Sequence, residues 1–280
     1  MTRTIHVAHS PDSDDAFMFY ALAEGKIDTG DLRYEHELSD IESLNRRALQ
    51  AELEVSAVSI HAYAHLHRTY ALLASGSSMG DGYGPRLVSR RPAPDDPREA
   101  LRGLRVAIPG TLTTACLALR LYQPAITEVV IPFDEIEDAV HRGEVDVGLL
   151  IHEGQLTYAD DGLHLWEDLG AWWGRETGLP LPLGGNVVRR DLGAEVTAQV
   201  ARDLRASIEY ALAHRQPALE HAKRFNRGIG DERTDTFVGM YVNEWTVDYG
   251  PRGREAVQVL LDRAHAAGLL PGRVVAEFVG

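Results

Sequence analysis

The chain has 280 residues, enough for one large domain or two of ordinary size, and its hydrophobic fraction of 44% can fill a core. The formal charge of −14, with no basic run to offset it, argues against nucleic acid as a partner. No run approaches the roughly 18 apolar residues that a membrane span needs, and the first residues enter a strand pattern without a signal-peptide segment. We therefore expect a cytoplasmic protein without a membrane partner.

The N-terminal part alternates short apolar strands with helical patterns, which is typical of a parallel sheet flanked by helices. A strand over 4–9 and a turn over 10–13 precede a helix expected over 14–24 and closed by Gly25. The spacing of Ser39 and Glu42 predicts a capping box at the next helix. Asn45 falls on the apolar stripe of that helix, so it either joins a hydrogen-bond network or faces a ligand.

The same alternation continues to about residue 152. Strands are expected over 53–58, 104–108 and 144–151, with helices over 60–67, 114–122 and 133–142. A Pro-rich segment at 90–97 is typical of a connection between lobes. After a returning strand near 186–191, helices are expected over 194–214, 216–225, 231–242 and 254–268. This order predicts two lobes joined by two crossings, with 1–88 and 187–280 in the larger lobe and 89–186 in the smaller.

Hydrogen-bonding side chains follow several of these strands. They are Ser10 and Asp14 after the first strand, Ser59 after the second, Thr113 and Thr114 after the third, and His152 after the fourth. Such strand ends share one edge of an α/β sheet, and in a two-lobed protein both edges face a cleft. We therefore expect these residues at a ligand cleft, although Ser and Thr in such turns also serve as helix caps.

Other patterns favour structural roles. Cys116 lies on an apolar helix face and is interpreted as a buried side chain rather than a nucleophile. His61 and His65 have the i, i+4 spacing of metal ligands, but no carboxylate motif accompanies them, so no metal site is expected. Trp172 and Trp173 either form the wall of an aromatic pocket or pack between the lobes.

Several ordered motifs together resemble the 1,4-dihydroxy-6-naphthoate synthase family of the futalosine route to menaquinone. They are DIESLN at 40–45, GTLTTA at 110–115, GLLIHE at 148–153, LGAWW at 169–173, GLPLPLG at 178–184 and YVN at 241–243. The resemblance covers nearly the whole chain. It implies an α/β, two-lobed fold like that of type II periplasmic binding proteins, used by a cytoplasmic enzyme.

The resemblance also implies a lyase that converts cyclic de-hypoxanthinyl futalosine into 1,4-dihydroxy-6-naphthoate without a cofactor. In that family the histidine matching His152 is the proposed general base, and positions matching Asn45, Ser59, Thr113 and Thr114 line the substrate cleft. Oligomeric state is not implied.

One turn departs from the family pattern. The family commonly has SPCPNDTF, whereas residues 10–17 are SPDSDDAF, so Asp14 replaces an asparagine and Ala16 a threonine. This leaves open a divergent branch with an altered substrate. Chorismate dehydratase, from the same pathway, and a non-catalytic small-molecule-binding protein are the alternatives.

Overall fold

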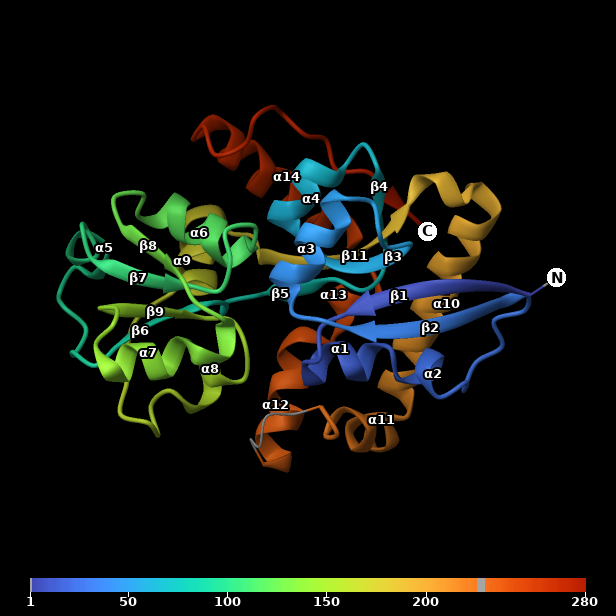
Figure 1. Cartoon of the computed structure of the whole chain (residues 1–280), viewed down its shortest axis with the longest axis horizontal. Helices are drawn as coiled ribbons and strands as arrows, with labels where there is room; N and C mark the ends of the chain where they lie inside the picture. Colours follow the sequence, from blue (N-terminus) through green and yellow to red (C-terminus); the bar gives the residue numbers. More distant parts are fainter. Residues whose placement is uncertain (1, 226–229) are drawn as a thin grey trace.

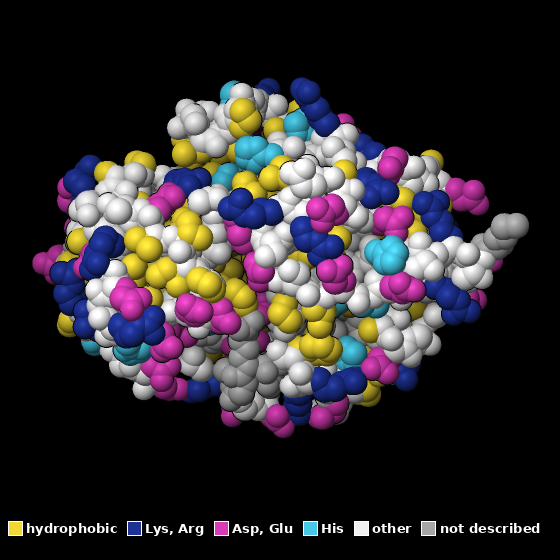
Figure 2. Space-filling view, viewed as in Figure 1, with side chains coloured by type: hydrophobic (Ala, Val, Ile, Leu, Met, Phe, Trp, Pro, Cys, Tyr) yellow, Lys and Arg dark blue, Asp and Glu magenta, His cyan; other side chains and the backbone are white. Residues whose placement is uncertain are grey.

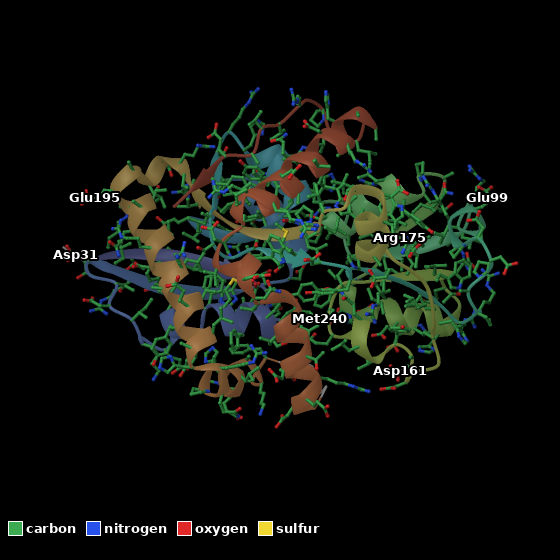
Figure 3. The ribbon with its side chains drawn as sticks, turned by 180° about the vertical axis from the view of Figure 1, so that it is seen from behind. Asp31, Glu99, Asp161, Arg175, Glu195 and Met240 are labelled. Carbon is green, nitrogen blue, oxygen red and sulfur yellow. The ribbon has the colours of Figure 1, made fainter. Side chains whose placement is uncertain are left out.

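The structure, a computed structural model, describes residues 2–225 and 230–280, and these residues form two β-sheets flanked by helices. Figure 1 shows the two sheets in separate bodies, with the green middle part of the chain gathered in the smaller one. From behind, Figure 3 shows Arg175 and Asp161 on the smaller body, and Asp31 and Glu195 at the far end of the larger one. The two bodies are the larger and smaller lobes of the description that follows.

The larger lobe contains the seven-stranded sheet of the described residues. In pairing order its strands are β12 (Phe278–Val279), β4 (Tyr70–Leu73), β11 (Leu181–Arg189), β3 (Val55–Ser59), β1 (Arg3–His9) and β2 (Leu32–Leu38), with β5 (Ser78–Gly80) paired to β11. β1 runs parallel to β2 and β3, whereas β11 runs antiparallel to β3, β4 and β5. The carboxyl ends of β1 and β3 therefore meet at one edge of the sheet.

Helices from both ends of the chain cover this sheet. They are α1 (Ser13–Met18), α2 (Tyr20–Ala23), α3 (Ile41–Leu49), α4 (Ile60–Leu66), α10 (Ala194–Ala213), α11 (Arg215–Ala222), α12 (Asp231–Tyr241), α13 (Glu244–Val247) and α14 (Gly250–Ala266), with the 3-10 turn η2 (Arg190–Leu192). The single helix expected over 14–24 is two helices, because the backbone leaves helical geometry at Phe19. The break places the Phe19 ring in a stack on His9, with centroids 4.5 Å apart.

The smaller lobe contains the five-stranded sheet of the described residues. In order its strands are β10 (His164–Asp168), β6 (Arg86–Ser89), β9 (Val147–Leu150), β7 (Arg105–Ile108) and β8 (Thr127–Val130). Its helices are α5 (Pro97–Ala100), α6 (Thr114–Tyr122), α7 (Ile136–Arg142), α8 (Gly154–Thr157) and α9 (Leu169–Thr177), with the 3-10 turn η1 (Phe133–Glu135). β7 runs parallel to β8 and β9, so the loops after β7 and β9 leave the same edge.

Within residues 2–225 and 230–280 the chain crosses between the sheets twice. It leaves the larger sheet after β5 and enters the smaller one at β6, and it returns between α9 and β11. The residues that connect an element of one lobe to a strand of the other are 81–85 and 178–180, a few residues before the expected lobe limits. The Pro-rich segment 90–97 is not a crossing, because it follows β6, which is already paired with β9 and β10.

The structure tests three of the sequence interpretations. Trp172, Trp173 and Cys116 are buried in one apolar core that includes residues of both lobes, so the two tryptophans pack rather than form a pocket wall. Asp40, not Ser39, caps α3 by accepting a hydrogen bond from the Ser43 N–H at 3.0 Å. The expected capping box is therefore wrong.

No helix of the described residues is long and apolar enough to cross a membrane. On the face in Figure 2, acidic and basic side chains intermingle over both lobes.

Candidate active site between the lobes

A cavity of about 120 Å³ lies between the lobes, at the edge where the predicted strand ends meet. The larger lobe contributes the turn after β1, the end of β3 and part of β11, and the smaller lobe contributes the loop after β7 and the segment after β9. Among the expected site residues, those that line the cavity are Ser10, Asp14, Ser59, Thr113 and Thr114. Asn45 and His152 are not among the described residues that line it.

Ser59, the last residue of β3, is held by Asn45 of α3. The Asn45 Oδ1 accepts a hydrogen bond from the Ser59 N–H at 2.9 Å, and the Asn45 Nδ2 donates to the Ser59 Oγ at 3.0 Å. Asn45 is fully buried, and this pair meets its need for partners. Because the Ser59 oxygen accepts from Asn45, its own O–H proton is left to donate toward the cavity. Asn45 thus contributes to the cavity through Ser59.

Thr113 and Thr114 use their hydroxyl groups within the protein. Thr113 caps α6 and also donates to the Gly110 carbonyl at 2.9 Å. The Thr114 Oγ1 accepts from the His61 N–H of the larger lobe at 3.1 Å and donates to the Leu183 carbonyl at 2.5 Å. The Cys116 N–H donates to the capping Thr113 hydroxyl at 3.1 Å, whereas the N–H groups of Thr114 and Ala115, which begin α6, have no carbonyl partner within the helix. They are the donors that this loop offers to a ligand.

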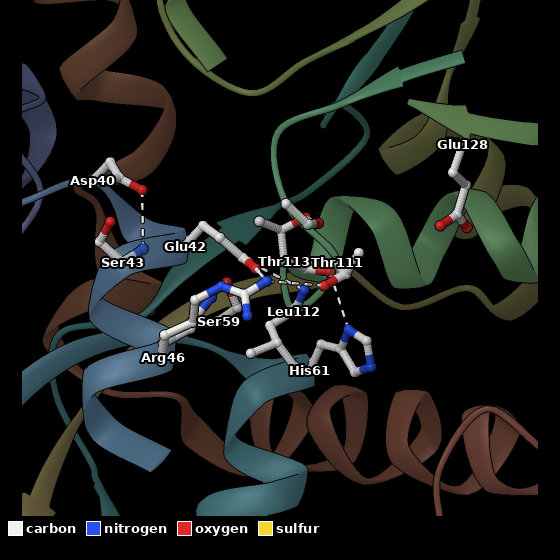
Figure 4. A network of polar contacts seen from close by, with 12 residues as sticks. Asp40, Glu42, Ser43, Arg46, Ser59, His61, Thr111, Leu112, Thr113 and Glu128 are labelled. Atoms are coloured by element: carbon white, nitrogen blue, oxygen red, sulfur yellow. Dashed lines mark hydrogen bonds and ion pairs between the residues drawn. The ribbon is translucent and has the colours of Figure 1, made fainter. Parts of the chain in front are cut away.

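Glu42 of α3 ties the larger lobe to the loop after β7 (Figure 4). Its Oε2 accepts from the Leu112 N–H at 3.1 Å, and its Oε1 pairs with the Arg46 guanidinium at 2.7 Å. A Cβ on Gly110 would lie 2.3 Å from the Glu42 Oε2, so a glycine is required for this approach. The contact closes one side of the cavity.

Two further bonds join the lobes on the other side. The Ser13 hydroxyl of α1 donates to the Glu153 carboxylate at 3.0 Å. The Tyr241 hydroxyl of α12 donates to the Gln155 Oε1 at 2.7 Å, and both of these residues line the cavity. Hydrogen bonds between the lobes therefore lie beside the cavity at α3, α1 and α12.

The turn after β1 is acidic. The Ser10 hydroxyl donates to Asp12 at 2.5 Å, and the Ser10 N–H donates to the Asp15 Oδ2 at 2.7 Å. Burial, and next the neighbouring Asp15 and Asp12 charges, raise the pKa of Asp14 well above its usual range. Burial raises the pKa of Asp15 to about 7. The turn therefore retains at least one proton near neutral pH.

His152 lies just outside the cavity, between the lining residues Ile151 and Gln155. Its Nε2 donates to the Phe133 carbonyl at 3.0 Å, and its Nδ1 accepts from the Gly154 N–H at 2.8 Å. These partners define the neutral tautomer with the proton on Nε2.

Glu137 of α7 lies beside the His152 ring. Both side chains approach Gly154 closely: a Cβ on that glycine would lie 2.6 Å from the Glu137 Oε2 and 2.6 Å from the His152 Cε1. The carboxyl group and the ring therefore flank the same point. Burial, followed by the charges of Asp161 and Asp138, raises the pKa of Glu137 to about 7. A carboxyl group that titrates near neutrality is thus a neighbour of the imidazole.

Two more histidines lie behind the acidic turn. The His9 Nδ1 donates to the Ser10 carbonyl at 2.9 Å, so its Nε2 accepts from the His36 Nδ1 at 3.3 Å. Burial, with the neighbouring His36 second, lowers the pKa of His9 to about 3, and burial lowers that of His36 to about 4. Both rings are therefore neutral at physiological pH.

Sequence reasoning missed Asn186, Gln155 and Tyr241, which line the cavity from β11, α8 and α12. For Asn186 a signal exists, because it is a lone amide between two glycines and two valines of a strand. Tyr241 begins the YVN motif of the family resemblance, which did not mark it as a site residue, and Gln155 carries no local signal. Both reach the cavity through the packing of the lobes.

Comparison with known proteins identifies the family. A family described as menaquinone biosynthesis matches residues 5–266. A 1,4-dihydroxy-6-naphthoate synthase from Thermus thermophilus is 41% identical over 265 residues, covering 95% of both chains. One from Streptomyces coelicolor is 38% identical over 278 residues, covering 96% of this chain and 95% of its own.

Solved structures support the fold. A crystal structure of a protein from Archaeoglobus fulgidus is 48% identical, with a TM-score of 0.91 and coverage of 95% of this chain and 98% of that one. The alkanesulfonate-binding protein from Xanthomonas axonopodis is 13% identical, with a TM-score of 0.68, and covers 99% of this chain and 97% of its own. The expected two-lobed fold of the type II periplasmic binding proteins is therefore confirmed.

Proposed function

Because the chain belongs to the menaquinone biosynthesis family, we propose that it converts cyclic de-hypoxanthinyl futalosine into 1,4-dihydroxy-6-naphthoate. The observation that carries the proposal is its 41% and 38% identity to two synthases of that name over nearly their whole length. The interlobe cavity supports it by offering a concave site for a small molecule. A cytoplasmic location and a reaction without a cofactor are parts of the same proposal.

In this proposal His152 is the general base. Its imidazole is neutral and so able to take a proton, and the residues on either side of it line the cavity. Before it reacts, its Nδ1 lone pair has to leave the Gly154 N–H and turn toward the substrate. The amide that holds it belongs to α8, a helix of only four residues. The movement needed is therefore confined to a short segment.

Glu137 supports the same step. A carboxylate beside the ring favours the imidazolium that forms when His152 accepts a proton. Ser59 and the amides at the start of α6 hold the carboxylate of the substrate and so orient the reacting part of the molecule. The lobes exclude water during the reaction.

The test is an assay of the purified protein on cyclic de-hypoxanthinyl futalosine and on chorismate, side by side, with detection of products by mass spectrometry. We expect the naphthoate from the first substrate only. His152→Ala should lower kcat by about 100-fold or more. The exposed His164 of β10 provides the matched control, and His164→Ala should stay within twofold of the wild type.

Other outcomes of these assays would contradict the proposal. Consumption of chorismate would identify a chorismate dehydratase, and tight binding without turnover would identify a binding protein. Activity of His152→Ala within a few fold of the wild type would remove His152 from the role of base.

A further inference from the structure

Asn186 of β11 has an unusual position for a buried amide. It is only 1% exposed and lines the cavity. Its Nδ2 donates to the Gly76 carbonyl at 2.9 Å, which fixes the orientation of the amide group. Its Oδ1 has no hydrogen-bond partner among the described residues. Buried acceptors are nearly always partnered, so one that borders a cavity is suited to a donor on a ligand.

The backbone around Asn186 is built to keep this amide in place. A Cβ on Gly76, whose φ is +86°, would lie 2.4 Å from the Asn186 Nδ2, so this approach requires glycine. The Met18 Sδ of α1 contacts the same nitrogen at 3.4 Å. The nitrogen side of the amide is therefore occupied by protein, and the oxygen side is the one left to a ligand.

The strand register relates Asn186 to Ser59. Asn186 lies opposite Ala57 and Gly184 lies opposite Ser59 in the β11–β3 pair, so all four residues belong to one face of the sheet. The two positions are two residues apart, or roughly 7 Å along the strands. Ser59 offers an O–H donor, whereas Asn186 offers an acceptor. The cavity thus has a donor end and an acceptor end.

Charge reinforces this polarity. Thr114 and Ala115 line the cavity and place the first amides of the nine-residue helix α6 there, which favours a negatively charged group. Asp14 and Asp15 line the cavity from the turn after β1, and their carboxyl oxygens can accept hydrogen bonds from hydroxyl groups.

We infer that Asn186 is a specificity-determining residue that accepts a hydrogen bond from a hydroxyl group of the substrate, whose carboxylate lies at Ser59 and the start of α6. The inference rests on the proposed function for its ligand chemistry. The naphthoate product has that chemistry, with two hydroxyls on one ring and a carboxylate on the other. A hydroxyl donor at Asn186 distinguishes such a molecule from an aromatic acid without hydroxyls.

The test compares two ligands on the same protein preparation by calorimetry. 1,4-Dihydroxy-6-naphthoate has the hydroxyls, and 2-naphthoate has the same rings and carboxylate without them. We expect the wild type to bind the dihydroxy compound about tenfold more tightly, as one well-placed hydrogen bond provides. In Asn186→Ala the two compounds should bind with equal affinity. Ser59→Ala should lower the affinity for both compounds by the same factor. A ratio within one preparation is unaffected by a fraction of misfolded protein.

Three results would overturn the inference: equal affinities in the wild type, an unchanged ratio in Asn186→Ala, or binding of neither compound. Failure of the proposed function is a separate result, because it appears as lack of turnover of the cyclic futalosine. With the ratio present in the wild type and lost in Asn186→Ala, the hydroxyl-recognition role of Asn186 holds even for a protein that does not turn that substrate over.

Discussion

Replacing Asn45 with alanine tests how the edge of the cavity is held. The change removes hydrogen bonds of 2.9 and 3.0 Å and leaves the Ser59 N–H buried without an acceptor. A hydrogen bond contributes about 1 kcal/mol, and a buried donor left without a partner costs about 1–3 kcal/mol. Asn45 is fully buried, so its removal also leaves a void. We expect the free energy of unfolding to fall by about 2–4 kcal/mol.

Thermal unfolding measures this loss, which corresponds to roughly 5–10 °C in Tm for a chain of this length. Ser59→Ala is the matched comparison, because it removes only the bond to the hydroxyl oxygen and keeps the one to the Ser59 N–H. The double variant should be more stable than the sum of the two single losses predicts, since the hydroxyl bond can be lost only once. A Tm for Asn45→Ala within 2 °C of the wild type, or strict additivity, would refute the reasoning.

Three further predictions concern packing, pH and closure. Gly185→Ala places a Cβ 2.2 Å from the buried Tyr249 hydroxyl and should cost about 1–3 kcal/mol in unfolding free energy. Adding Tyr249→Phe should recover most of it, and a double variant that stays as unstable would contradict the steric cause. The folded-state pKa of His36 is about 4, below its usual 6.5, so the unfolded chain binds more protons and stability falls as pH drops from about 6.5 to 4. Urea unfolding at several pH values should show that His36→Phe reduces the slope of unfolding free energy against pH by up to about 1.4 kcal/mol per pH unit. The same slope in the wild type and the variant would exclude His36 as the cause of the fall. Glu42→Ala removes the acceptor of the Leu112 N–H, so small-angle scattering should give a larger radius of gyration for the ligand-free protein; an equal radius would show that this contact does not hold the lobes.

The sequence predicts the longer helices and five of the twelve strands of the described residues, and the failures have local physical causes. The hydrophobic pattern predicts β1, β3, β7 and the long C-terminal helices, because the strands contain runs of buried residues and the helices bury one apolar face. It does not predict β10, whose residues 164–168 are mostly polar because the strand lies at a sheet edge. At α3 the two neighbouring residues Ser39 and Asp40 both suit an N-cap, and tertiary contacts of Glu42 decide between them.

The candidate site likewise contains residues that could be predicted from the sequence and residues that could not. Ser10, Ser59 and Thr113 could be predicted because residues that follow parallel strands meet at one edge. Asn186 could not, since it lies in the interior of an antiparallel strand that returns from the other lobe. The sequence placed His152 close to the cavity, but the partners of its ring nitrogens depend on packing against η1 and α8.

The late position of β11 in the chain affects the order in which the two sheets can form during translation. β11 lies between β3 and β4, so the seven-stranded sheet has a gap at its centre until residues 181–189 have left the ribosome. The five-stranded sheet comes from one uninterrupted stretch, 86–168, and can form earlier. During translation the edges of β3 and β4 that pair with β11 therefore stay unpaired and prone to aggregation, while the smaller sheet can already form. A nascent chain stalled before residue 181 would hold a finished lobe tethered to an unfinished one.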